Sequence, residues 1–244
     1  MGDMRCAILA DIHGNLAAFH AVLNDIEGRG GADEIWCLGD IIGYGPDPSE
    51  CIALLRQYDH LCVAGNHDWA AIGKVDISDF NPEAAAACVW TGRQLSDEDV
   101  RYIDNLPLVL CRGDFAIVHG SPREPTWEYV LSTQSAQVNF NFFDTRYCLI
   151  GHSHVPLVFE LAGETCLLKE LPAELELGEN RLIVNPGGVG QPRDGDPRAA
   201  YAIYDEEGKT IYHYRVAYDI EATQKKMVGY GLPKFLVTRL SYGR

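Results

Sequence analysis

The chain has 244 residues and carries 35 acidic against 20 basic side chains, which gives a formal net charge of −15. With 47% hydrophobic and 23% charged residues it has the composition of a folded globular protein, and its length is enough to bury a sizeable core. The acidic balance argues against nucleic acid or an anionic membrane as a partner. The longest apolar stretch, residues 84–90, is far below the roughly 20 residues of a membrane span, and no secretory leader opens the chain. We therefore expect a cytoplasmic protein.

The first 70 residues alternate short apolar runs with helical patterns. Three apolar runs predict strands: residues 6–10, 35–38 and 61–64. Two stretches between them, residues 16–26 and 49–58, have apolar side chains at helical spacing. This alternation predicts a βαβ sheet with largely parallel strands.

The middle of the chain is predicted to be helical and the remainder rich in strands. Asn81 followed by proline, and Ser96 followed by three acidic residues, are typical helix starts. The later strands are predicted at residues 108–111, 115–118, 147–150, 157–161, 165–168, 181–184, 199–204 and 210–216. Two helices, from Asp219 and from Pro233, are expected to close the chain. Without an internal repeat or a long linker, residues 1–244 are expected to form one domain with two packed sheets and outer helices.

Eight cysteines are spread along the chain, and none forms a C-x-x-C pair. Most lie inside apolar runs, which does not fit a thiol metal site or a disulfide scaffold. We expect them to be buried packing residues in a reducing compartment.

Polar side chains follow five of the predicted strands at the point where each strand ends. A lone Asp there is usually a turn residue, and a lone His is usually a surface or satisfied core group. However, five of the eight histidines have this placement, and ligand sites in open α/β sheets lie beyond the carboxyl ends of strands. His20, His60 and His213 lack this setting and are expected to be structural. The residues expected to converge are Asp11, His13, Asp40, Asn66, His67, His119, His152 and His154.

The chemistry of this set points to metal ions. Imidazole together with carboxylate and amide oxygens suits Mn, Fe, Zn, Co or Ni better than Ca or Mg. Two Asp, one Asn and four His make seven ligands, too many for one tetrahedral zinc but about right for two ions that share a carboxylate. Asp11 and His13 are two apart on an extended segment and therefore point to the same side, as do His152 and His154.

In their order along the chain, five motifs resemble those of the calcineurin-like metallophosphoesterase superfamily: Asp11-x-His13, Gly39-Asp40, Gly65-Asn66-His67-Asp68, His119-Gly120 and Gly151-His152-Ser153-His154. Residues 39–46 and 185–193 resemble a branch of small bacterial and archaeal phosphoesterases in particular. The resemblance implies a four-layer α/β/β/α sandwich with two mixed β-sheets flanked by helices.

The resemblance also implies how the ligands divide between two divalent transition-metal ions. Asp40 would bridge the ions, and His67 would face the substrate and protonate the leaving group. Manganese is the ion we expect first, with iron, zinc, cobalt or nickel as alternatives. One ion would be held by Asp11, His13, Asp40 and His154, and the other by Asp40, Asn66, His119 and His152.

The function that follows is hydrolysis of a small phosphomonoester or phosphodiester by attack of a metal-bridged hydroxide. Asn66, Arg193 and Tyr44 are the candidates for substrate contacts. Arg193 lies on a loop rich in Gly and Pro, and its guanidinium can pair bidentately with phosphate. Tyr44, in the loop after Asp40, is a candidate for the pocket wall. For both residues, an ordinary surface position is the alternative.

Two observations bear on competing functions. Gly43 and Tyr44 stand where protein phosphatases of the superfamily carry Asp and Arg, which argues against a protein phosphatase and leaves the partner of His67 unidentified. The alternative from another class is a non-catalytic metal- or phosphate-binding module of the same fold that acts through protein partners. Such a module is expected to lose ligands or His67, and this chain keeps all of them.

Overall fold

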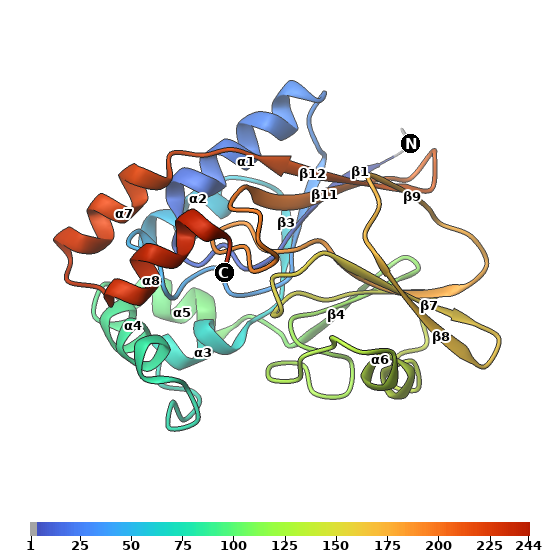
Figure 1. Cartoon of the computed structure of the whole chain (residues 1–244), viewed down its shortest axis with the longest axis horizontal. Helices are drawn as coiled ribbons and strands as arrows, with labels where there is room; N and C mark the ends of the chain where they lie inside the picture. The colour runs from blue at the N-terminus through green and yellow to red at the C-terminus, as the bar shows by residue number, and fades with distance from the viewer. Residues whose placement is uncertain (1–3) are drawn as a thin grey trace.

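Two sheets of six strands each face one another in the computed structural model, which describes residues 4–244 (Figure 1). Sheet A has the order β3-β2-β1-β11-β12-β9, and β1, β2 and β3 run parallel while the other pairs are antiparallel. Its strands are β1 (Arg5–Leu9), β2 (Glu34–Cys37), β3 (His60–Cys62), β9 (Glu174–Glu176), β11 (Ala199–Asp205) and β12 (Thr210–Val216).

Sheet B has the order β4-β5-β6-β10-β7-β8 and is also mixed. Strands β5, β6 and β10 run parallel, and the hairpins β4–β5 and β7–β8 are antiparallel. Its strands are β4 (Val109–Arg112), β5 (Phe115–Val118), β6 (Tyr147–Leu149), β7 (Leu157–Ala162), β8 (Thr165–Glu170) and β10 (Arg181–Asn185).

Alternation along the central strand β1 makes sheet A apolar on both faces there. In β1, Cys6 and Ile8 point into the layer between the two sheets, where they pack with Trp36 and Phe115. The neighbouring Ala7 and Leu9 point to the opposite face and pack with the helices. Because a strand turns successive side chains to opposite faces, a fully apolar strand requires cover on both sides.

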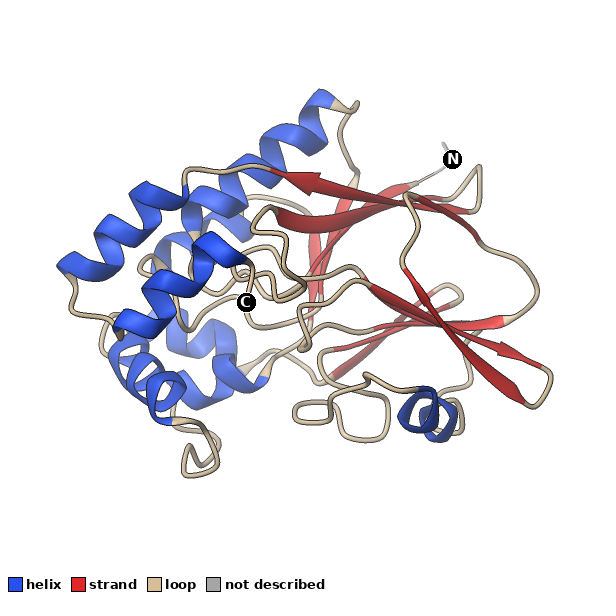
Figure 2. Ribbon diagram, viewed as in Figure 1, coloured by secondary structure: helices blue, strands red, loops and turns tan. Residues whose placement is uncertain are grey.

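Helices supply the outer cover of both sheets (Figure 2). Helix α1 packs on β11 and β12, and α6 packs on β7 and β8, so the layers follow the order α/β/β/α. Helices α4, α7 and α8 share a further apolar cluster near the C-terminus. The helices are α1 (Leu16–Gly28), α2 (Pro48–Leu55), α3 (Asn66–Ala71), α4 (Pro82–Gly92), α5 (Asp97–Asp104), α6 (Thr133–Asn139), α7 (Ile220–Gly229) and α8 (Lys234–Arg239), followed by a short 3₁₀ turn, η1 (Leu240–Tyr242).

The predicted fold class is therefore confirmed, and each predicted strand and helix is present with its ends shifted by a few residues. Three elements were not predicted. Strand β9 is short and acidic, α6 has few apolar residues, and α3 begins at Asn66 inside a segment interpreted as a strand end. Seven of the eight cysteines are buried as expected, whereas Cys111 on β4 is exposed. None of the helices in residues 4–244 is both long and apolar enough to cross a membrane.

Candidate metal centre

The loops that leave the carboxyl ends of the strands hold their polar residues in an uncommon backbone conformation. Seven non-glycine residues among those described have positive φ, and five of them are predicted ligands. Each costs on the order of 1–3 kcal/mol and persists only where the surrounding structure enforces it. The five, with φ between 51° and 64°, are Asp11, His13, Asp40, His152 and His154, so the prediction that the pairs Asp11/His13 and His152/His154 lie on extended segments is wrong.

Asp68 connects the loop after β2 to the start of α3 through hydrogen bonds. Its carboxylate accepts hydrogen bonds from the backbone N–H groups of Asp40 (2.8 Å), Ile42 (3.1 Å) and Gly65 (3.0 Å). Gly65 packs so closely on Asp40 that a Cβ there would collide with the Asp40 carboxylate. The loop after β2 and the start of α3 are thus locked in register, which fixes where Asp40 points.

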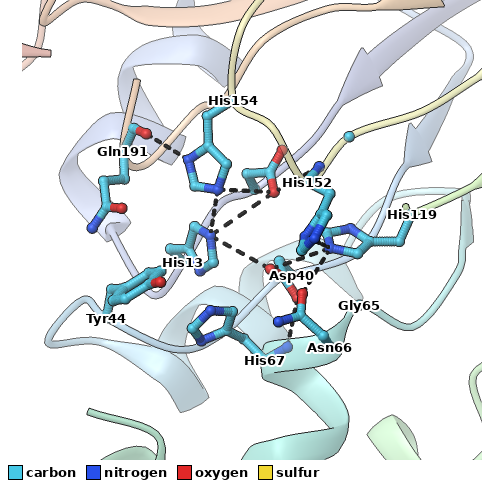
Figure 3. A network of polar contacts seen from close by, with 12 residues as sticks. His13, Asp40, Tyr44, Gly65, Asn66, His67, His119, His152, His154 and Gln191 are labelled. Atoms are coloured by element: carbon cyan, nitrogen blue, oxygen red, sulfur yellow. Dashed lines mark hydrogen bonds and ion pairs between the residues drawn. The ribbon is translucent and has the colours of Figure 1, made fainter. Parts of the chain in front are cut away.

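The structure brings the predicted metal ligands into two buried triads (Figure 3). Within each triad, the ligand atoms lie within 4.8 Å of one another. Asn66 joins the second triad, because its Oδ1 lies 3.1 Å from Nε2 of His119. The triads consist of Asp11, His13 and His154, and of Asp40, His119 and His152.

The Asp40 carboxylate lies between the two triads. Its Oδ2 is 3.6 Å from Nε2 of His13 in the first triad and 3.4 Å from Nε2 of His119 in its own. Its Oδ1 accepts the backbone N–H of His67 (2.9 Å), which leaves Oδ2 directed at the space between the histidines. Asp40 is therefore placed to contact two ions at once.

Ring nitrogens converge on the same space. Nε2 of His13 lies 3.1 Å from Nε2 of His154, and Nε2 of His119 lies 3.1 Å from Nδ1 of His152. The outer nitrogen of each ring faces a main-chain carbonyl oxygen: Ile42 for His13 (3.2 Å), Leu38 for His119 (2.9 Å), Trp127 for His152 (3.2 Å) and Gln191 for His154 (2.5 Å).

These carbonyl contacts set the tautomers. A carbonyl oxygen only accepts hydrogen bonds, so the outer nitrogen of each ring donates and carries the proton. In a neutral ring, the inner nitrogen is then a bare lone pair, which is the form that binds a metal. Main-chain carbonyls thus orient all four imidazoles toward one centre.

Two buried carboxylate oxygens without hydrogen-bond partners also indicate that the donor set fits divalent ions. Within the described residues, Oδ2 of Asp11 and Oδ2 of Asp40 are buried without a hydrogen-bond partner. A buried carboxylate oxygen without a partner is costly, and opposed imidazole lone pairs cannot satisfy one another. Cations between them would satisfy both the oxygens and the nitrogens, and the mixture of imidazole, carboxylate and amide ligands suits transition metals.

Burial and the charges within the centre shift its pKa values in opposite directions. Burial lowers the pKa of His13, His152 and His154 well below the ordinary value, so these rings are neutral in the metal-free chain. Burial would also lower the pKa of His119, but the Asp40 carboxylate raises it to about 9. Burial raises the pKa of Asp11 to about 7.

His67 lies beside the triads with its imidazole outside them. Its Nδ1 is 3.3 Å from the buried thiol of Cys88 on α4, and its ring contacts the Tyr44 ring at a centroid distance of 4.2 Å. Burial lowers the pKa of His67 to about 4 and raises that of Cys88 well above its ordinary value. Gly43 leaves the space that His67 fills, because a Cβ there would lie 2.9 Å from the imidazole.

Cys88 is the neighbour of His67 that the sequence did not reveal. The sequence predicts a packing role for all eight cysteines, and neither the spacing of Cys88 nor its helical setting marks it as a site residue. Asp68, adjacent to His67 in sequence, is instead held by three backbone N–H groups.

The three candidates for substrate contacts lie around the same centre. Asn66 is buried, and Tyr44 is only 6% exposed, so the alternative of a surface tyrosine is wrong. Arg193 is half-buried, and its Nη2 lies 3.0 Å from Oε1 of Gln191 and 3.5 Å from the Tyr44 hydroxyl. Tyr44, Asn66, His67 and His152 line one open pocket of about 200 Å³.

Known proteins share both the sequence pattern and the fold. A sequence model of the calcineurin-like phosphoesterase superfamily domain matches residues 4–209. A metallophosphoesterase of Sphaerobacter thermophilus, a solved structure, is 45% identical with a TM-score of 0.89 and 100% of each chain covered. An uncharacterized protein of Methanocaldococcus jannaschii is 42% identical over 98% of each chain. A symmetrical bis(5′-nucleosyl)-tetraphosphatase of Chromobacterium violaceum is 27% identical, covering 59% of this chain and 53% of its own.

Replacing Asp40 by Asn is expected to weaken both metal sites together, because a neutral amide then stands between the triads. Elemental analysis after manganese loading should find about two ions per wild-type chain and fewer than one per Asp40→Asn chain. Asp205→Asn, a change on β11 outside the centre, is the control and should keep both ions. Loss of a single ion from Asp40→Asn, with the other retained, would contradict the bridging position.

Metal affinity is expected to rise with pH. A proton on His119, whose pKa is about 9 in the metal-free chain, must leave before the ring can bind a metal, and so must any proton on Asp11, whose pKa is about 7. Calorimetric titration with Mn²⁺ should show affinity that increases by up to about tenfold per pH unit for each proton released, and that levels off above about pH 9. An affinity that stays constant between neutral pH and pH 9 would rule out this linkage.

Proposed function

The chain belongs to the calcineurin-like phosphoesterase superfamily, and on that premise we propose that it is a dinuclear-metal-dependent hydrolase of small phosphomonoesters or phosphodiesters. The observation that carries the proposal is the unpartnered Oδ2 of Asp40, buried between two triads of metal-binding side chains. A single-ion site would not need a carboxylate shared in this way.

The ligand assignment follows the two triads. Manganese is the first ion to test, with iron, zinc, cobalt and nickel as alternatives, because the donors suit all of them. We assign one ion to Asp11, His13, Asp40 and His154, and the other to Asp40, Asn66, His119 and His152.

The centre selects anionic substrates through its own charge. When bound, two divalent ions supply an acidified water as nucleophile and offset the charge of the phosphoryl oxygens. The carboxylates of Asp11 and Asp40 balance only half of the ions' positive charge. The centre therefore attracts a phosphate ester, although the protein as a whole carries a formal net charge of −15.

His67 is the proposed general acid for the leaving group. The Cys88 thiol keeps its proton because burial raises its pKa, and it can donate that proton to Nδ1 of His67. The ring proton of the neutral His67 is then on Nε2, the nitrogen available to the pocket. The negative charge of a bound phosphate ester would raise the pKa of His67, and the imidazolium so formed would give its Nε2 proton to the leaving-group oxygen and return to the neutral ring. In this scheme Cys88 is a positioning residue. Its thiol is neutral, whereas a carboxylate at the same place would raise the pKa of the His67 imidazole.

Arg193 and Tyr44 complete the proposed substrate contacts. None of the ion pairs in residues 4–244 involves the Arg193 guanidinium, so its charge is available to a phosphate oxygen that the metal ligands do not reach. The hydrogen bonds to Gln191 and to the Tyr44 hydroxyl hold this guanidinium on the side of the centre where Tyr44 lies. Tyr44 in turn packs against both His13 and His67.

Phosphoester hydrolysis by the manganese-loaded protein tests the proposal. We expect turnover of p-nitrophenyl phosphate or of bis(p-nitrophenyl) phosphate, and loss of turnover after chelation with recovery on adding Mn²⁺. A panel of small metabolite esters, with bis(5′-nucleosyl) tetraphosphates included because of the Chromobacterium relative, then ranks the substrates. Two bound ions without turnover of any ester would favour the non-catalytic binding module instead.

Replacing His67 by Ala is expected to leave metal content unchanged and to lower kcat for alkyl phosphates by about 10²–10⁴-fold. The loss should be much smaller for p-nitrophenyl phosphate, because its leaving group delocalises the negative charge and needs no proton. His60→Ala, on the far end of β3, is the control and should match the wild type for both substrates. Equal losses for alkyl and p-nitrophenyl esters would remove His67 from the role of acid.

A further inference from the structure

The pocket beside the metal centre has an aromatic wall that the hydrolysis of a phosphate ester does not require. The residues that line it fall into two groups. One group consists of the site residues Asn66, His67 and His152, and the other of the aromatic residues Phe80, Trp127 and Tyr129. These three aromatic residues come from two segments, the connection between α3 and α4 and the loop after β5, which begins at the metal ligand His119.

The aromatic residues contact one another and the site histidines. Phe80 and Trp127 meet edge to face with their ring centroids 5.1 Å apart, and Phe80 also lies 4.9 Å from the His67 ring. Tyr129 stacks on His152 at 3.9 Å with an interplanar angle of 19°. The wall therefore meets the proposed general acid at Phe80 and a metal ligand at Tyr129.

The backbone fixes this wall relative to the centre. The carbonyl oxygen of Trp127 accepts the Nε2 proton of His152 at 3.2 Å, so the segment that carries Trp127 and Tyr129 is tied to a metal ligand. Figure 3 shows the other partners of the centre, His67 and Asn66, beside Asp40. The aromatic wall therefore lies next to the place where a phosphate would react, so one small molecule can reach both.

Part of the wall is open rather than buried in the core. Tyr129 is 47% exposed, and Phe80 and Trp127 are half-buried although both are large and apolar. Aromatic faces left open beside a polar site are typical of places where a ligand completes the packing.

Polar groups at the rim offer hydrogen bonds to the edge of a planar ligand. The Asp79 carboxylate makes no hydrogen bond with any other residue in 4–244, and it can only accept. The Asn81 Oδ1 accepts the N–H of Ala84 (2.9 Å) as the cap of α4, which leaves the Asn81 amide NH₂ free to donate. An acceptor and a donor two residues apart match the mixed donor and acceptor pattern on the edge of a nucleobase.

We propose that the pocket walled by Phe80, Trp127 and Tyr129 binds a nucleobase, so that the ester reacting at the metal centre is a nucleotide. This inference rests on the proposed function and narrows it to a substrate class. At about 200 Å³ the pocket is smaller than the roughly 300–1,000 Å³ of drug-sized ligand sites, so it takes one ring system. A simple phenyl ring would make no hydrogen bond with the exposed Asp79 and Asn81 side chains, and a sugar alone would leave the aromatic faces without a planar partner.

Two measurements separate base recognition from catalysis. The first follows binding of adenosine and of guanosine to the metal-free protein by saturation-transfer NMR, with ribose as the base-free comparison. The second compares kcat/KM for adenosine and guanosine 5′-monophosphates, ribose 5-phosphate and phenyl phosphate in the manganese-loaded protein. We expect nucleoside binding without metal, and for at least one nucleotide a kcat/KM about tenfold or more above that of the other two esters, since stacking of one base contributes on this scale.

Trp127→Ala and Phe80→Ala are the test variants. Both are expected to raise KM for the preferred nucleotide about tenfold, to raise KM for ribose 5-phosphate much less, and to keep full metal content. Phe142→Ala is the matched control, because Phe142 is 52% exposed and lies outside the pocket. Tryptophan fluorescence of the variants, recorded without ligand, checks that each remains folded.

The outcomes distinguish this inference from the function on which it rests. Hydrolysis with equal kcat/KM for nucleotides, ribose 5-phosphate and phenyl phosphate would overturn nucleobase recognition and leave the phosphoesterase proposal standing. Nucleoside binding that depends on Trp127, without hydrolysis of any ester, would support the base site and contradict the phosphoesterase proposal. A nucleotide preference that survives both variants would place recognition elsewhere and overturn the inference.

Discussion

The candidate site depends on one constraint, the burial of a carboxylate oxygen that the protein itself does not satisfy. Oδ2 of Asp40 lies within 3.6 Å of histidine nitrogens from both triads, and no hydrogen bond in residues 4–244 reaches it. An isolated charge in such a position would be strongly destabilising. Strained loops, the hydrogen bonds to Asp68 and the absence of a side chain at Gly65 all hold this oxygen in place, so the fold maintains a centre that favours cations.

Each of the two sheets supplies part of the ligand set of this centre. Parallel strands of sheet A deliver Asp11, Asp40 and Asn66 at their carboxyl ends, and parallel strands of sheet B deliver His119 and His152. The Nδ1 proton of His119 reaches the carbonyl of Leu38 across the two sheets, so the packing of one sheet on the other also sets the imidazole geometry. The packing that stabilises the sandwich therefore also positions metal-binding side chains.

Much of this could be predicted from the sequence, because the ligands follow apolar strands and the ends of parallel strands meet at one edge. The role of other residues could not be predicted for physical reasons. The main-chain carbonyls of Trp127 and Gln191 orient His152 and His154, and a carbonyl has no side-chain signature. Cys88 reaches His67 from a helix distant in sequence, and Phe80 enters the pocket from a connection without periodic pattern. Contacts of this kind arise from tertiary packing rather than from local spacing.

The most direct test of a shared carboxylate is a crystal structure of the manganese-loaded protein with anomalous diffraction recorded at the metal edge. Two anomalous peaks, one beside Asp11, His13 and His154 and one beside Asn66, His119 and His152, with the Asp40 carboxylate in contact with both, are the expected result. One peak alone, or metal bound away from Asp40, would contradict the account.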